Sequence, residues 1–308
     1  MTLRQKLRRI DWVGNTLVIA GTAAMLYALT GAGVIHSWAS WNTLLPLLLG
    51  LLGLILFAAW EARGGGLSPD LVMPPRLFHH RTSLIIAICT FFHWMLVYWS
   101  LYFLPVWFQA VFLYSAECTG VGILPLSLVT IPGSAISAMA VTLQLRNGCF
   151  CAIGAAMGLD TLLPAFQAPV PESDQAAATS TCTFIRTVGG VWGVAVPAAI
   201  FNNRINQLAY TISDPNTRRL MMGGDGYQHA SADFVNSFPE PVYKEALQLV
   251  FLTAVAFGDG VAVLFLLEKD VSLWKELETE YGLVEQGQKQ KEANGNRSVE
   301  KRPPETSS

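Results

Sequence analysis

The sequence predicts an all-α, polytopic helical membrane protein with six or seven transmembrane spans. Two observations lead to this fold class. Hydrophobic residues make up 52% of the 308 residues and charged residues only 14%, with a mean hydropathy of +0.40, so the chain is too apolar for an ordinary soluble domain. The apolar residues also gather in long segments, and a helix needs about twenty of them to cross about 30 Å of hydrocarbon.

Five segments easily reach the length of a span. They are residues 12–33, 42–60, 83–105, 119–143 and 246–267. The first of them follows a basic amino terminus, as the apolar part of a secretory signal does. It is about twice as long as that part and lacks a convincing cleavage region, so we interpret it as a first span.

Two further segments are weaker. Segment 180–201 carries Arg186 and many small residues, which is typical of a helix buried among other helices, and we count it as a span. Segment 149–166 is short, contains Asp160 and leads into a proline-rich stretch, so its crossing of the membrane is in question.

Lysine and arginine favour the cytoplasmic side of short loops. The amino terminus is basic, loop 34–41 has neither residue, loop 61–82 has three arginines, loop 106–118 has none, and Arg146 follows. If segment 149–166 crosses, the basic tail ends outside; if it does not, the tail stays inside. The charge rule favours the second alternative, and the sequon at Asn296 serves as a probe of it.

We expect three regions along the chain: a linker-type helix pair at 1–61, a partial C-terminal transporter bundle at 62–280, and a disordered tail at 281–308. The tail is polar and lacks aromatic residues beyond about residue 285, so it has nothing with which to form a core.

Several stretches occur in a characteristic order. LRRIDWVGN opens the chain, and MPPRLFHHRTS, YFLPVWFQAVF, GVGILPLS and TFIRTVGGVWGVAVPAAIFNNR follow. Together they resemble the fungal fourteen-span drug:H+ antiporters of the major facilitator superfamily, over nearly all of residues 8–285. The resemblance implies efflux of a small hydrophobic compound or toxin in exchange for protons, most often across the plasma membrane.

The resemblance begins in the middle of such a transporter and departs from it between Leu145 and Gly154. At that place the family has a basic cytoplasmic loop and one further helix. We therefore expect a truncated form that is inactive alone. The alternative is a non-transporting membrane protein that associates with a partner supplying the missing helices.

Ionisable groups within apolar segments are candidates for the substrate or proton pathway, because each is costly in hydrocarbon. Arg186 is a candidate contact for an anionic substrate or a carboxylate, and snorkelling is the alternative. Asp259 is a candidate proton carrier or partner of Arg186, and Asp160 lies at a helix break or carries a proton. His93 lies among aromatic residues that either line a cavity for planar compounds or pack as a core.

Small residues at helical spacing predict close helix packing. Gly189 and Gly193 form one such pair, and Gly154 and Gly158 form another. We find no nucleophile with its base, no phosphate-binding loop and no spaced metal ligands, and we interpret the Cys149 and Cys151 pair as apolar packing. The sequence thus predicts no enzyme, no metal and no cofactor. A net charge of −2 without a basic face argues against nucleic acid, so the expected partners are the lipid bilayer, a small hydrophobic substrate and protons.

Overall fold

The fold is described from a computed structural model of the chain. It describes residues 10–33, 35–64, 71–125, 128, 158–222, 224–227, 229–235 and 241–266. The chain divides into two units, residues 1–273 and 274–308, and all described residues belong to the first. The prediction of a disordered tail therefore lies outside the described residues.

Five long helices dominate the described part of the chain, and each is long and apolar enough to cross a membrane. They are α2 (Trp12–Gly31), α3 (Trp41–Ala62), α4 (Arg81–Ala110), α8 (Gln175–Leu208) and α11 (Val242–Leu266). The all-α fold is confirmed, since no strand occurs among the residues that the structure describes. Of the predicted span 119–143, residues 119–125 and 128 are described as helical, and the others lie outside the described residues.

Short helices connect the long ones. They are η1 (Pro75–Phe78), α7 (Gly158–Gln167), η2 (Glu172–Asp174), η3 (Ala209–Thr211), α9 (Pro215–Met221), η4 (Asp225–Tyr227) and α10 (Ala232–Val235). Asp214 caps α9 by accepting a hydrogen bond from the backbone N–H of Thr217 at 2.9 Å. The hydroxyl and backbone N–H of Thr217 hold the pKa of Asp214 below its usual range, so this cap persists as the pH falls.

Helices α2 and α3 pack against each other through glycines. A Cβ added to Gly21 would lie 3.1 Å from the backbone oxygen of Gly50, and one added to Gly53 would lie 3.0 Å from the Cα of Gly21. Without side chains at these positions the two backbones approach closely, which allows van der Waals packing in a solvent that supplies no hydrophobic driving force between helices.

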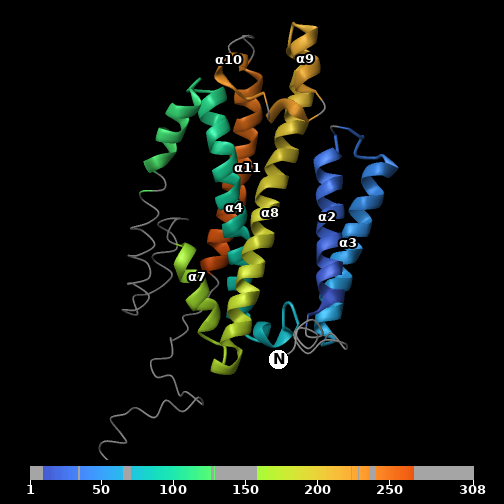
Figure 1. Cartoon of the computed structure of the whole chain (residues 1–308), viewed down its shortest axis with the longest axis vertical. Helices are drawn as coiled ribbons and strands as arrows, with labels where there is room; N and C mark the ends of the chain where they lie inside the picture. Colours follow the sequence, from blue (N-terminus) through green and yellow to red (C-terminus); the bar gives the residue numbers. More distant parts are fainter. Residues whose placement is uncertain are drawn as a thin grey trace, which may run out of the picture. The chain divides into compact units, whose positions relative to one another are not determined.

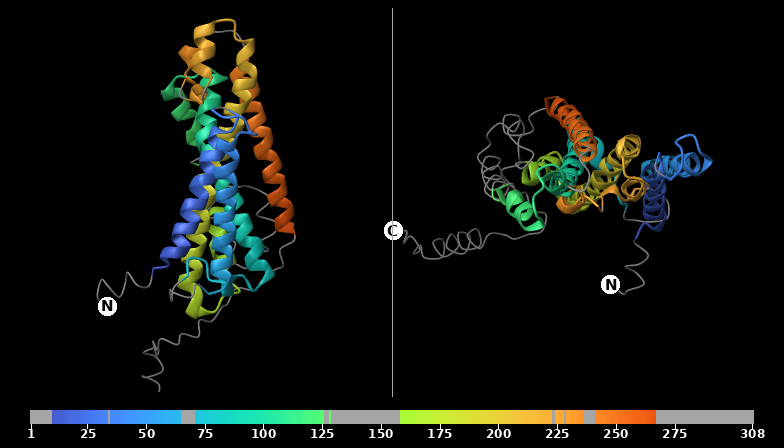
Figure 2. Two further views of the ribbon diagram at one scale, coloured as in Figure 1. Left: turned by 90° about the vertical axis from the view of Figure 1, so that its right-hand side faces the viewer. Right: turned by 90° about the horizontal axis from the view of Figure 1, so that it is seen from above.

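Helix α8 forms a bundle with α4 and α11. On its other side, α8 packs against the pair α2 and α3 (Figures 1 and 2). The bundle core is aromatic. Phe103 of α4 contacts Phe201 of α8 with ring centroids 5.9 Å apart, and Phe201 contacts Tyr243 of α11 at 6.0 Å. These three side chains are almost fully buried, and they hold the three helices together.

The closest approach of α4 to α8 is at two glycines one helical turn apart. A Cβ on Gly189 would collide with the carbonyl oxygen of Phe91, and a Cβ on Gly193 would collide with that of Met95. The obstacle in each case is backbone, which cannot rotate away as a side chain does. The separation of the two helices is therefore set by the absence of side chains at Gly189 and Gly193.

Contacts between helix ends show which ends of the long helices lie on the same side of the molecule. Arg76 pairs with Asp174 at 3.0 Å, and Phe78 contacts Phe166 with ring centroids 6.0 Å apart, so α4 and α8 begin at the same end of the molecule. We call this the inner end, because it carries the arginines of the predicted cytoplasmic loop 61–82. At the outer end, the side chain of Asn203 donates a hydrogen bond to the backbone oxygen of Ala32 at 2.9 Å.

Helices α4 and α8 thus run parallel, and α11 returns to the inner end (Figure 1). Ten residues of helix α7 are described, which corresponds to a length of about 15 Å. This arrangement agrees with a segment 149–166 that does not cross; residues 149–157 of that segment lie outside the described residues.

The turn between α2 and α3 is fixed to α8 by what we call the outer asparagine contact, made by Trp38, Asn203 and Asn206. The indole N–H of Trp38 donates to Oδ1 of Asn203 at 3.3 Å, and the side-chain amide of Asn206 donates to the backbone oxygen of Gly33 at 3.1 Å. Gly33 has a φ of +75°, a conformation that favours glycine. The helix pair is thereby bound to the bundle at its outer end.

We predict that Gly193→Ala destabilises the protein by about 1–3 kcal/mol, because the new methyl group collides with the backbone of α4. Gly260→Ala is the matched control, since a Cβ at Gly260 meets nothing within 4 Å. Equilibrium unfolding in mixed micelles measures both variants. Equal stability of the two would contradict the packing described here.

We predict that the loop after α8 lies outside and the tail inside. His229→Asn creates a glycosylation sequon that ends at Ser231, and expression in a eukaryotic host should add a glycan there. The natural sequon at Asn296 should stay unmodified in the same cells. A glycan at Asn296, removable by an endoglycosidase, would show that α11 runs in the opposite direction.

Candidate functional site

Two of the predicted site residues meet where α4 packs on α8. The guanidinium carbon of Arg186 lies 5.5 Å from the ring centroid of Trp94, and Arg186 also interacts electrostatically with His93. His93 is only 6% exposed, and its ring contacts that of Trp94 edge to face at 6.4 Å. A cation on an indole face is a stable arrangement that also orients the guanidinium.

Two buried nitrogen atoms at this site have no hydrogen-bond partner among the described residues. They are Nε2 of His93 and Nε1 of Trp94. A buried polar atom without a partner costs about 1–3 kcal/mol, so such atoms collect at places where a ligand, water or ion completes the bonding. The pair of nitrogens beside a guanidinium provides polar groups for a ligand that accepts hydrogen bonds.

An aromatic column continues from this site along α4. The rings of Trp94 and Tyr98 lie 6.2 Å apart, and those of Tyr98 and Tyr102 are stacked at 6.3 Å. Gly190 of α8 makes room for this column, since a Cβ there would lie 3.0 Å from the ring of Tyr98. Planar compounds bind well to such stacked faces.

The other aromatic residues of α4 do not line this column. Trp99 and Phe103 are 0% and 1% exposed, and they belong to the bundle core. Helical geometry separates the two sets, because residues four apart share a face. The sequence offered cavity lining and core packing as alternatives for these aromatics; core packing holds for Trp99 and Phe103, and cavity lining stays a prediction for the column.

Of the predicted acids, only the side chain of Asp259 is described, and it does not pair with Arg186. Asp259 is exposed on α11 and takes part in no ion pair among the described residues. Asp160 lies in α7, and its side chain is outside the described residues, as is Gly154. Gly158 is the first residue of α7. Cys182 instead lies beside Arg186, and its thiol interacts with Arg186 and Thr90.

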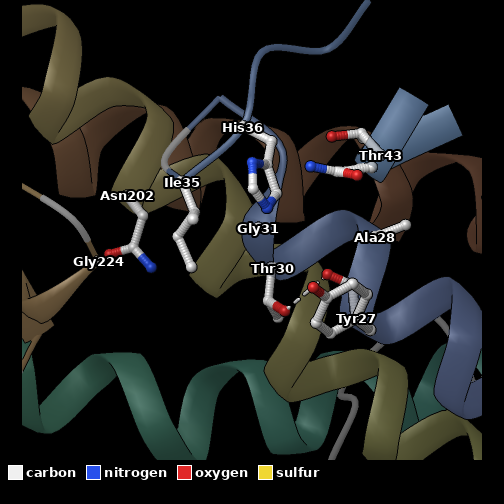
Figure 3. Close-up of a pocket in the computed structure, with 10 residues that line it drawn as sticks. Tyr27, Ala28, Thr30, Gly31, Ile35, His36, Thr43, Asn202 and Gly224 are labelled. Carbon is white, nitrogen blue, oxygen red and sulfur yellow. Dashed lines mark hydrogen bonds between the residues drawn. The ribbon is translucent and has the colours of Figure 1, made fainter. Parts of the chain in front are cut away.

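The structure also has a polar pocket that was not predicted from the sequence. A pocket of about 240 Å³ opens at the outer end between α2, α3 and α8, lined by Tyr27, Ala28, Thr30, Gly31, Ile35, His36, Asn42, Thr43, Asn202 and Gly224. Figure 3 shows His36 and Thr43 on one side and Asn202 on the other. Its residues come from four separate segments of the chain, so no local sequence pattern predicts it.

Comparison with known proteins gives the family. No protein-family model matches the chain, and no solved structure matches it. The chain is 44% identical to the MFS-type transporter TwmF of Talaromyces wortmannii, over 93% of this chain and 60% of TwmF. It is 35% identical to the MFS-type efflux pump LUC4 of a Fusarium species, over 92% of this chain and 57% of LUC4.

The chain is similar to transporters of the major facilitator superfamily. A third relative, the MFS-type transporter of the acurin A biosynthesis cluster in Aspergillus aculeatus, is 36% identical over 92% of this chain and 58% of its own length. The predicted resemblance to fungal efflux transporters of this superfamily is thus confirmed, and with five apolar helices the chain is a multi-pass membrane protein.

The chain spans about 60% of the length of TwmF. The alignment with TwmF covers 329 positions, but 93% of 308 residues is only about 286, so about 40 aligned positions have no counterpart here. A span with a connecting loop has about this length, since the span alone takes about twenty residues. Within the matched region, this chain is therefore shorter than TwmF.

Proposed function

We propose that this chain forms part of an efflux transporter for small, planar, hydrophobic compounds. The observation that carries the proposal is the site at the α4–α8 contact, where Arg186, His93 and Trp94 meet, in a chain 44% identical to a fungal MFS-type transporter. Apolar aromatic faces with a few placed polar groups are the usual composition of a small-molecule site.

In this proposal the compound lies against Trp94 and Tyr98, and Arg186 contacts an acidic or hydrogen-bond-accepting group on it. The unpaired Nε2 of His93 and Nε1 of Trp94 add two polar contacts. Such a site selects a flat molecule with one polar edge. Export is driven by proton entry, as in the antiporters that the sequence resembles, and takes place at the plasma membrane.

We further propose that the 308-residue chain does not transport by itself. Alternating access moves two helical bundles against each other around a site between them. The described residues form one bundle, α4, α8 and α11, with the helix pair α2 and α3 beside it. About 40 positions of the alignment with TwmF have no counterpart in this chain, and this number fits the loss of one helix near Leu145 to Gly154. Residues 145–154 lie outside the described residues.

Arg186 should decide the preference for an acidic compound. We predict that Arg186→Gln weakens binding of naphthoate about tenfold, or about 1.4 kcal/mol, and leaves binding of the neutral naphthamide unchanged. Quenching of tryptophan fluorescence in the purified chain measures both affinities. Arg76→Gln is the matched control, because Arg76 is exposed and pairs with Asp174 at the inner end.

A loss of equal size for naphthoate and naphthamide would show that Arg186 holds the fold rather than the ligand. Unchanged affinity for naphthoate would remove Arg186 from the site. Either outcome contradicts the proposed role of the guanidinium.

Transport itself is tested in proteoliposomes with a proton gradient. We predict no proton-coupled movement of naphthoate by the 308-residue chain, and movement by a chimera that adds the unmatched part of TwmF and the segment of about 40 residues. TwmF is the positive control for the preparation. Proton-coupled transport by the 308-residue chain alone would overturn the proposal that it is inactive by itself.

A further inference from the structure

Two buried carboxyl groups lie at the inner end of the helix pair, and neither is among the residues of the α4–α8 site. Asp11 precedes α2 and is 2% exposed; Glu61 lies in the last turn of α3 and is 4% exposed. Burying a charge at the edge of a bilayer is costly unless the charge is paired, hydrogen-bonded or neutralised. The two carboxyl groups differ in the hydrogen bonds and charges around them.

Asp11 has the surroundings of an ionised carboxylate. Its Oδ1 accepts a hydrogen bond from the backbone N–H of Gly14 at 2.9 Å and caps α2. The indole N–H of Trp60 approaches both oxygens, at 3.2 and 3.3 Å. A helix amino terminus favours a negative charge, and each of these donors stabilises it further.

Glu61 has the opposite surroundings. Its Oε1 accepts a hydrogen bond from the backbone N–H of Val72 at 3.1 Å, and the backbone of Met73 also interacts with this carboxyl group. Its Oε2 has no hydrogen-bond partner among the described residues. The carboxyl-terminal end of a helix disfavours a negative charge. Surroundings that differ in this way can favour a charged carboxylate at one position and a neutral carboxylic acid at the other.

The charged group that the described residues bring to Glu61 is another acid. Helix α2 contributes Asp11, which interacts electrostatically with Glu61. The segment after α3 contributes the backbone of Val72, and α8 contributes the uncharged Thr181, whose hydroxyl donates to the backbone oxygen of Val72 at 3.4 Å. Arg63, two residues beyond Glu61, is exposed.

We propose that Glu61 is a proton-binding site, which holds its proton at neutral pH beside an ionised Asp11. The ligand is a single proton, exchanged with water at the inner end, and its loss turns the carboxylic acid into a second buried carboxylate next to the first. Glu61 then repels Asp11, while its hydrogen bond from the backbone N–H of Val72 becomes stronger, since a carboxylate is the better acceptor.

This inference does not rest on the proposed efflux, since proton binding is measurable in a chain that transports nothing. Infrared spectroscopy of the purified chain in nanodiscs detects the carbonyl stretch of a protonated carboxylic acid. At neutral pH we expect such a band in the wild type and its loss in Glu61→Gln. Gln keeps the acceptor for Val72, so the fold is retained. Glu117→Gln, at an exposed acid, is the matched control and should keep the band.

Asp11→Asn provides a second measurement, which remains informative if Glu61→Gln does not fold. Removing the neighbouring negative charge makes ionisation of Glu61 easier, so the band should titrate at a lower pH than in the wild type. A band that survives in a folded Glu61→Gln variant would overturn the proposal. So would its absence from the wild type, or an unchanged titration in Asp11→Asn.

Discussion

The contact between α4 and α8 at Gly189 and Gly193 is the constraint on which the rest of the bundle depends. Both glycines meet backbone carbonyls of α4, those of Phe91 and Met95, and His93 lies between these two positions in the sequence. Arg186 lies one turn before Gly189 on α8. The closeness of the two backbones therefore brings the guanidinium onto Trp94 and beside His93, so one packing contact places the whole candidate site.

The spans were predictable because hydrocarbon requires a long apolar helix, and this requirement is visible in a single sequence. The helix ends were not, because a helix can continue past the bilayer in polar residues. Segment 180–201 was predicted, whereas α8 runs over Gln175–Leu208. Residues 202–208, beyond the predicted span, are the end of α8.

The candidate site was predictable only in its residue types. Arg186 and His93 stood out as polar groups in apolar segments, but their meeting depends on how α4 and α8 rotate about their axes, which composition does not specify. The exposure of Asp259 depends on the same rotation. Asp11 and Glu61 escaped notice for another reason: each stands at the edge of a span, where contact with water is the usual situation of an acid.

The outer asparagine contact has a mechanical consequence. The helix pair is joined to α8 at the outer end through Asn203, and near the inner end through Phe57, whose ring lies 6.4 Å from that of Phe184. A body attached to its neighbour at both ends cannot pivot on it. The helix pair and α8 therefore move together as one body, and any hinge in the described part of the chain lies elsewhere.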